Sequence, residues 1–171
     1  MGPIGAQGPQ GSQGPRGETG AAGPAGTTGQ TAFTVGTTLR TAVTTVNVLT
    51  DLGLSGMVNI TSTSSVVTLA TDGGIQINSN VSGQSAVVNI VLLLDNATFL
   101  AGRQYIVSNN TGFVGVTNWS FTTSVSSPTL TVGMHSFKVF AQYAGGTATA
   151  FAGATPGSLL QGSLTVTALN R

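Results

Sequence analysis

The chain has 171 residues, of which 40% are apolar, and only five basic and four acidic residues, which give a formal net charge of +1. Because the few charges form no basic patch, nucleic acid is not an expected partner. The chain has no cysteine, which excludes disulfides and cysteine-based metal sites, and its longest apolar run, IVLLL at 90–94, is too short for a membrane-spanning helix.

The N-terminal segment carries glycine at every third position from Gly2 to Gly29, and the period ends after Thr31. A strict Gly-X-Y period predicts a collagen triple helix, because only glycine fits at the axis where three polyproline-II-like chains meet. A flexible Gly/Pro-rich linker is the alternative, but a linker has no reason to keep the period unbroken. We therefore expect residues 1–31 to form a collagen-like stalk, whose axis is lined by Gly2, Gly5, Gly8, Gly11, Gly14, Gly17, Gly20, Gly23, Gly26 and Gly29.

A triple helix needs three chains, so the stalk predicts a homotrimer, with a rod of roughly 90 Å at a rise of about 3.1 Å per residue. Its prolines all occupy the X position, and none occupies Y, the position hydroxylated in animal collagen. Such a short stalk should be marginally stable alone, so residues 32–171 are expected to hold the three chains in register. If Met1 is the native start, no signal peptide precedes the stalk, which favours release by lysis or assembly on a particle.

Residues 32–171 are predicted to form one all-β head, because helix formers are scarce and β-branched residues dominate. Turns are expected at 72–74, 95–96 and 145–146, where Gly, Asp and Asn interrupt the alternating runs. About nine strands without a helix indicate a sandwich or jelly roll. The predicted strands are 45–50, 56–61, 65–71, 73–78, 85–95, 103–108, 117–125, 135–143 and 162–169.

The strand at 85–95 is apolar on both faces, which predicts burial on both faces. One face should meet the opposing sheet, and the other needs a cover, which a neighbouring subunit or a long loop of the same chain could supply. In the strand at 135–143, an apolar residue shares the outer face with Lys138 and Gln142. The residues predicted to form a trimer interface are Val87, Val91, Leu93 and Phe140.

Three stretches of the head carry a family resemblance: VVNIVLLLDN (87–96), LTVGMHSFKVFAQYAGGTATA (130–150) and GSLTVTALNR (162–171). They show a strand ending in an Asp turn, a strand introduced by a Gly-Met-His turn and followed by Gly-Gly-Thr, and a closing Leu-Thr-Val strand. With the stalk, they resemble the C1q/TNF-like class of trimeric jelly rolls, and more narrowly the tips of collagen-stalked bacteriophage fibres and bacterial collagen-like surface proteins. The resemblance covers under half of the head, and it implies a ten-strand jelly roll, trimeric about a hydrophobic axis, that caps the rod.

Residues suited to catalysis or metal binding are few. His135 is the only histidine, and Asp51, Asp72 and Asp95 are the only carboxylates of the head. We interpret His135 as a turn residue that opens a strand, and the three aspartates as turn residues. The D-x-D spacing of a loop calcium site and the G-x-S-x-G elbow of a serine hydrolase are both absent. We expect no enzyme activity, no catalytic or metal site and no cofactor.

Two groups of aromatic residues could contact a carbohydrate. Trp119, Phe121 and Tyr105 are one group, although aromatics at alternate strand positions are more often core or interface. The loop NNTGFVGVTN (109–118) is the other, with Phe113 exposed to meet a sugar or, alternatively, tucked into the core. The predicted receptor residues are Asn109, Asn110 and Phe113.

These observations predict a structural fibre protein: a homotrimeric rod with a globular tip on a virion surface, as a tail or capsid fibre. The expected partners are two further copies of the chain, a host cell-surface glycan or protein, and an anchor whose identity the residues do not indicate. A collagen-like protein of a bacterial cell or spore surface is one alternative. A passive decoration without a receptor is another.

Overall fold

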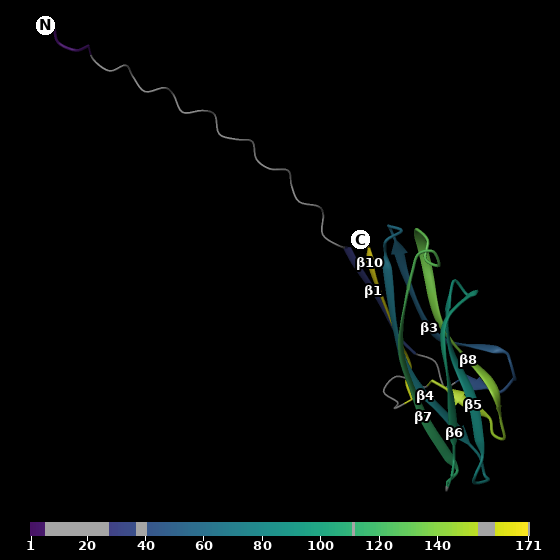
Figure 1. Ribbon diagram of the computed structural model, residues 1–171. Coiled ribbons are helices and arrows are strands. Elements are labelled where there is room, and N and C mark those ends of the chain that lie inside the picture. The colour runs from purple at the N-terminus through teal and green to yellow at the C-terminus, as the bar shows by residue number, and fades with distance from the viewer. Residues whose placement is uncertain (6–27, 37–40, 111, 154–159, 171) are drawn as a thin grey trace.

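The computed structural model describes residues 1–5, 28–36, 41–110, 112–153 and 160–170. Regular structure in these ranges is entirely β-strand, with no helix, as predicted (Figure 1). The glycines from Gly8 to Gly26 lie outside the described residues. The strands are β1 (Thr28–Val35), β2 (Thr41–Val43), β3 (Leu49–Ile60), β4 (Val66–Asn78), β5 (Ser85–Leu94), β6 (Thr98–Ser108), β7 (Val114–Ser126), β8 (Gly133–Gly146), β9 (Ala150–Ala152) and β10 (Ser163–Asn170).

The strands form two antiparallel sheets that pack face to face. Sheet A has the order β1-β10-β4-β9-β2, with β7 also paired to β4, and sheet B has the order β3-β8-β5-β6. Apart from the short β2 and β9, the strands pair in a nested order: β1 with β10, β3 with β8, β4 with β7, and β5 with β6. This nesting makes the head an all-β, jelly-roll-like sandwich.

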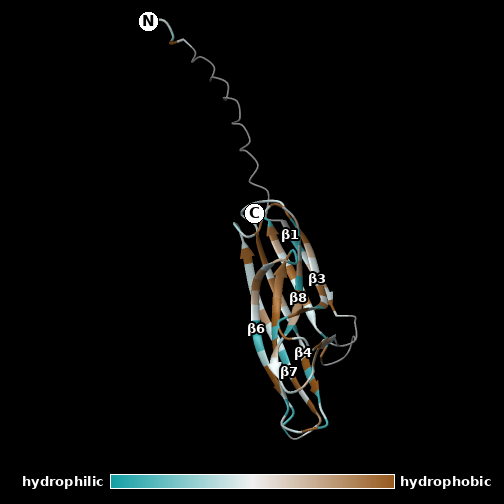
Figure 2. Ribbon diagram, turned by 90° about the vertical axis from the view of Figure 1, so that its right-hand side faces the viewer, coloured by the Kyte–Doolittle hydropathy of each residue, from teal (hydrophilic) through white to brown (hydrophobic). Residues whose placement is uncertain are grey.

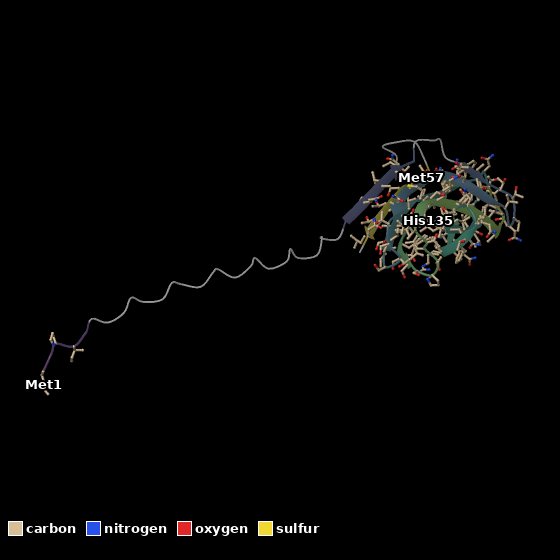
Figure 3. All side chains as sticks on the ribbon, turned by 90° about the horizontal axis from the view of Figure 1, so that it is seen from above. Met1, Met57 and His135 are labelled. Carbon is tan, nitrogen blue, oxygen red and sulfur yellow. The ribbon has the colours of Figure 1, made fainter. Side chains whose placement is uncertain are left out.

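The core lies between the two sheets, where alternate residues of each strand point inward. The burial of β3, β8 and β10 alternates residue by residue, and Figure 2 shows the matching change of hydropathy along the strands. Trp119 and Phe137 are the largest fully buried side chains. Figure 3 views the sandwich from above and shows side chains filling the space that the strands surround. Apolar burial of this kind supplies the main stabilisation of the head.

The turn predicted at 72–74 is wrong, because β4 runs through it without a break. Gly73 and Gly74 serve packing instead. A Cβ on Gly73 would lie 2.2 Å from Cζ2 of Trp119, and one on Gly74 would lie 2.3 Å from Cδ2 of Leu160. The two strands predicted at 65–71 and 73–78 are therefore one strand, and its glycines make room for an indole and a leucine.

The turn predicted at 95–96 is confirmed. Asp95 and Asn96 both have positive φ, 52° and 61°, and the Ala97 N–H donates to the Leu94 carbonyl at 3.1 Å. Two left-handed residues in succession match the right-handed twist of the hairpin that joins β5 to β6. At 145–146 the expected turn is absent, because β8 continues to Gly146 and the register against β5 shifts between Val87 and Val88.

Three strands were not predicted: β1, β2 and β9. The first begins at Thr28, so Gly29 pairs with Leu169 of β10. This corrects the expectation that Gly29 lines the stalk axis, because a residue paired in a sheet cannot also occupy the centre of a triple helix. Along β1, Gln30 exchanges two hydrogen bonds with the backbone of Asn59, at 3.0 and 3.1 Å, which joins the edge of sheet A to sheet B.

The two ends of the sandwich differ in what they carry. At one end, Thr28 of β1 lies opposite Asn170 of β10, and the two strands run side by side there in Figure 1. At the other end lie the β4–β5 loop (79–84) and the β6–β7 loop (109–113), since Asn78 pairs with Val114. We call this second end the distal end, because it is opposite to the start of β1.

Candidate binding surfaces

The predicted receptor loop lies at the distal end. Its aromatic residue, Phe113, is 68% exposed, so it is not tucked into the core. The Phe113 carbonyl accepts a hydrogen bond from Ser79 N–H at 2.9 Å, which fixes the backbone while the ring stays outside. Val81, Val114 and Val116 are also more than half exposed at this end. The distal end therefore presents apolar side chains held on a hydrogen-bonded backbone.

The two asparagines of this loop differ. Asn109 is only 2% exposed, and its side chain accepts from Gln84 N–H at 2.7 Å and donates to the Val81 carbonyl at 2.8 Å. The Asn109 side chain therefore joins the β6–β7 loop to the β4–β5 loop. Asn110 is exposed, and its Oδ1 lies 3.1 Å from the Ser108 hydroxyl, which donates to it. Of the three predicted receptor residues, Asn110 and Phe113 face solvent and Asn109 does not.

The predicted trimer-interface residues lie together on the outer face of sheet B. Val91 and Leu93 are only 8% and 6% exposed, whereas Val87 and Phe140 are half-buried. Phe140 lies opposite Val91 in the register of β8, and Phe99 lies opposite Leu93 in that of β6. Side chains of adjoining strands therefore cover part of this face of β5 within one chain.

A groove of about 670 Å³ runs along the same outer face. Three carboxamides cross it as a row, which we call the amide row: Gln142 on β8, Asn89 on β5 and Gln104 on β6. Asn89 Nδ2 donates to Gln142 Oε1 at 3.0 Å, and Gln104 Nε2 donates to Asn89 Oδ1 at 3.0 Å. The row fixes three polar side chains across neighbouring strands.

The rest of the groove is lined by apolar and aromatic side chains together with Asn47 and Asn96. Val91 and Leu93 contribute to the lining, and Phe99 is 62% exposed beside them. A Cβ on Gly102 would lie 3.2 Å from the Phe99 ring, so the glycine lets the ring lie against β6. Arg103 is the one charged lining residue, and its guanidinium lies 5.8 Å from the centroid of Phe121 in sheet A.

The sequence did not predict the groove. Asn89 interrupts the apolar run of its strand, which is a visible irregularity, whereas Gln104 follows Arg103 and Gln142 shares a face with Lys138. Only the register of β6 and β8 against β5 shows that the three are neighbours. Trp119, a candidate for a carbohydrate platform, is 1% exposed and Phe121 is 9% exposed, so packing, the favoured reading, is confirmed for both.

His135 is held in a polar cluster near the start of β8, and Figure 3 labels it within the sandwich. Its Nδ1 lies 2.8 Å from Asp95 Oδ2, and its Nε2 lies 2.9 Å from the Thr131 carbonyl oxygen. Both ring nitrogens therefore contact oxygen atoms, and His135 links the turn at Asp95 to the loop that contains Thr131. Partial burial raises the pKa of Asp95, but hydrogen bonds from Ser136 and His135 outweigh it and hold the pKa below its ordinary value.

Two further findings concern sites of other kinds. Within the described ranges, no three His, Asp or Glu side chains gather into a set that could hold a metal ion. The same ranges include no helix that could cross a membrane.

Comparisons with known proteins give only distant likenesses. No protein-family model and no curated protein matches the sequence. Among solved structures, the chain aligns with a structure of the Gx strain of infectious bursal disease virus at 15% identity and a TM-score of 0.41, covering 81% of this chain and 32% of the other. It aligns with the VP2 subviral particle of the same virus at 15% identity and a TM-score of 0.34, covering 84% and 38%. The chain thus spans about a third of the length of the proteins that it matches.

Proposed function

We propose that the chain is the subunit of a homotrimeric structural fibre, in which a collagen-like rod carries a C1q/TNF-like jelly-roll tip on the surface of a virion, and the tip attaches to a host cell. The observation that carries the proposal is the unbroken glycine period, which leads directly into β1. A period of three has a physical requirement only in the triple helix, and the triple helix requires three chains.

The position of β1 indicates how three heads would meet. Three chains that leave a triple helix are close to its axis, so the first strand of each head starts near that axis. That strand belongs to sheet A. One group of outward residues on β4, β7 and β10 is short and uncharged and would allow flat surfaces to approach closely: Thr68, Ala70, Thr122, Ser124, Thr165 and Thr167. Asp72 follows this group on β4 and accepts a hydrogen bond from the Ser163 hydroxyl at 2.9 Å.

The outer face of sheet B is the less suitable interface. Val91 and Leu93 are already covered by their own chain, so a neighbour would gain little from burying them. The same face carries the ion pair between Lys138 and Asp51, at 3.5 Å, which an interface would have to desolvate. We therefore place the trimer contact on sheet A.

The distal end is suited to attachment, because it lies opposite to the start of β1 and exposes Phe113. A trimer would present three copies of the same loops in one direction. Weak single sites then act together, since avidity can exceed single-site affinity by about 10² to 10⁴ when the geometry permits.

Sedimentation equilibrium of the full chain tests the assembly. We expect a mass three times that of the 17.0 kDa chain, together with the circular dichroism of a triple helix. Gly14→Ala should lower the melting temperature of the stalk, because it places a methyl group at the axis of all three chains. Ser12→Ala, at an X position, is the matched control. A monomeric full chain, or a Gly14→Ala variant that melts like the control, would remove the basis of the proposal.

A further inference from the structure

We propose that the groove on the outer face of sheet B is a binding site for a neutral saccharide. Its volume of about 670 Å³ lies within the usual range for ligand pockets, about 300–1,000 Å³. Its biological purpose rests on the attachment role proposed above, whereas the binding itself depends only on the groove.

The amide row has hydrogen-bonding capacity left over. Each carboxamide offers two N–H donors and a carbonyl acceptor. The three amides make only two hydrogen bonds with one another. Among the described residues, no other side chain or backbone group occupies Gln104 Oε1 or Gln142 Nε2. If the oxygen and nitrogen of all three side-chain amides were exchanged, both hydrogen bonds would run in the opposite direction. The row would still have a free donor at one end and a free acceptor at the other. Sugar hydroxyls both donate and accept, so neighbouring hydroxyls match such a row.

The row is also preorganised. Asn89 and Gln142 are half-buried and bonded to each other, so their rotamers are fixed before a ligand arrives. Binding then avoids most of the side-chain entropy cost, which is about 0.5–1.5 kcal/mol for each side chain that has to be immobilised. A row of cross-strand pairs would also stabilise the sheet by itself, but that role does not require an open groove beside it.

Phe99 supplies the second element of a saccharide site. The ring lies against Gly102, opposite Leu93, and is 62% exposed. An aromatic side chain beside a row of hydrogen-bonding groups matches a sugar ring, which has an apolar C–H face and polar edges. With Val91 at the floor, the groove combines apolar contact with directed hydrogen bonds.

The charge of the groove favours a neutral ligand. Among the residues that the structure describes, no acidic side chain lines the groove, and Arg103, the one cation there, makes its contacts elsewhere. Arg103 Nη1 donates to the Gly102 carbonyl at 3.0 Å, and its guanidinium lies over the Phe121 ring of sheet A. A carboxylated sugar would have to draw this guanidinium away from both contacts.

Calorimetric titration of the full chain with maltohexaose, cellohexaose, mannohexaose and chitohexaose tests the proposal, with a galacturonic acid hexamer as the anionic comparison. We expect at least one neutral oligosaccharide to bind in the millimolar range. Gln104→Ala and Phe99→Ala, both at exposed positions, should each weaken binding about tenfold. Val132→Ala, at an exposed position that does not line the groove, should leave the affinity unchanged.

Four results would overturn the inference: no heat with any neutral oligosaccharide, unchanged affinity in both groove variants, tighter binding of the galacturonic acid hexamer, or loss of the trimer in either groove variant. The last result would identify the groove as a contact between copies of the chain. Saccharide binding by a chain that does not attach to cells would support the groove and contradict the attachment role. Attachment through Phe113 without saccharide binding would support the attachment role and contradict the groove as a saccharide site.

Discussion

His135 and Asp95, separated by 40 residues in sequence, are joined by a contact of 2.8 Å between Nδ1 and Oδ2. Asp95 also accepts a hydrogen bond from Ser136 N–H at 2.8 Å, and the other nitrogen of His135 bonds the Thr131 carbonyl. This cluster ties the turn after β5 to the start of β8 and the loop before it. One carboxylate therefore anchors two connections at the end of the sandwich where β1 begins.

The first prediction concerns the pH dependence of stability. The folded pKa of Asp95 lies below its unfolded value, so its stabilising contribution is complete above about pH 4 and is lost as pH falls through the folded pKa. Asp95→Asn keeps the left-handed turn conformation but removes the titration. In urea titrations, the stability difference between parent and variant should therefore be largest above pH 4 and shrink below it.

Asp51→Asn is the control for this experiment, because its carboxylate pairs with Lys138 on the surface. An exposed pair of this kind contributes about 0–1 kcal/mol, so the variant should change stability little at neutral pH. A difference between the parent and Asp95→Asn that stays constant from neutral pH to pH 2 would contradict the role assigned to Asp95.

The second prediction concerns Gly73. Gly73→Ala should lower the free energy of unfolding by about 3 kcal/mol or more, because its Cβ would meet the indole of Trp119 at 2.2 Å. Gly112→Ala is the control, since a Cβ at Gly112 would have no atom within 4 Å. Urea denaturation followed by the fluorescence of Trp119, the only tryptophan, measures both. Equal stability of the two variants would mean that the packing of the Trp119 indole does not require a glycine at position 73.

Gly73 also shows where sequence reasoning reached its limit. The residues Asp72-Gly73-Gly74 have the composition of a turn, and local composition cannot reveal a buried indole that arrives from position 119. The hairpin at Asp95-Asn96 was predictable, because both of its requirements, left-handed φ values and flanking strands, are local. Local sequence patterns thus predicted the strands, whereas long-range packing determines which glycines lie in turns and which lie inside strands.

The surfaces show the same division. The apolar pattern of β5 predicted burial on both faces correctly, but the pattern could not tell that Phe99 and Phe140 lie beside its outer face. The sequence left open whether Phe113 is exposed or packed in the core. It did not predict that the Asn109 side chain joins the two distal loops. The amide row requires the register of three strands, which no single strand pattern contains.

The third prediction separates the two faces of the sandwich as trimer contacts. Thr122→Arg on sheet A should dissociate the heads or lower the trimer melting temperature, because three charges would be buried between flat surfaces. Ile106→Arg is the matched change on sheet B, beside Val87, at a side chain that is 67% exposed. It should leave the mass from sedimentation equilibrium unchanged. The opposite pattern would assign the interface to the outer face of sheet B.

The last prediction separates structure from contact at the distal end. Asn109→Ala should lower the free energy of unfolding by about 1–3 kcal/mol, because it leaves Gln84 N–H and the Val81 carbonyl without their partner. Phe113→Ala should leave stability within about 0.5 kcal/mol, because the ring is mostly in solvent. If the distal end attaches to host cells, Phe113→Ala should nevertheless reduce cell binding by the full chain, and a second exposed variant, Val132→Ala, should not. Equal cell binding by these last two variants would exclude Phe113 from recognition, and absence of binding by the parent chain would favour passive decoration.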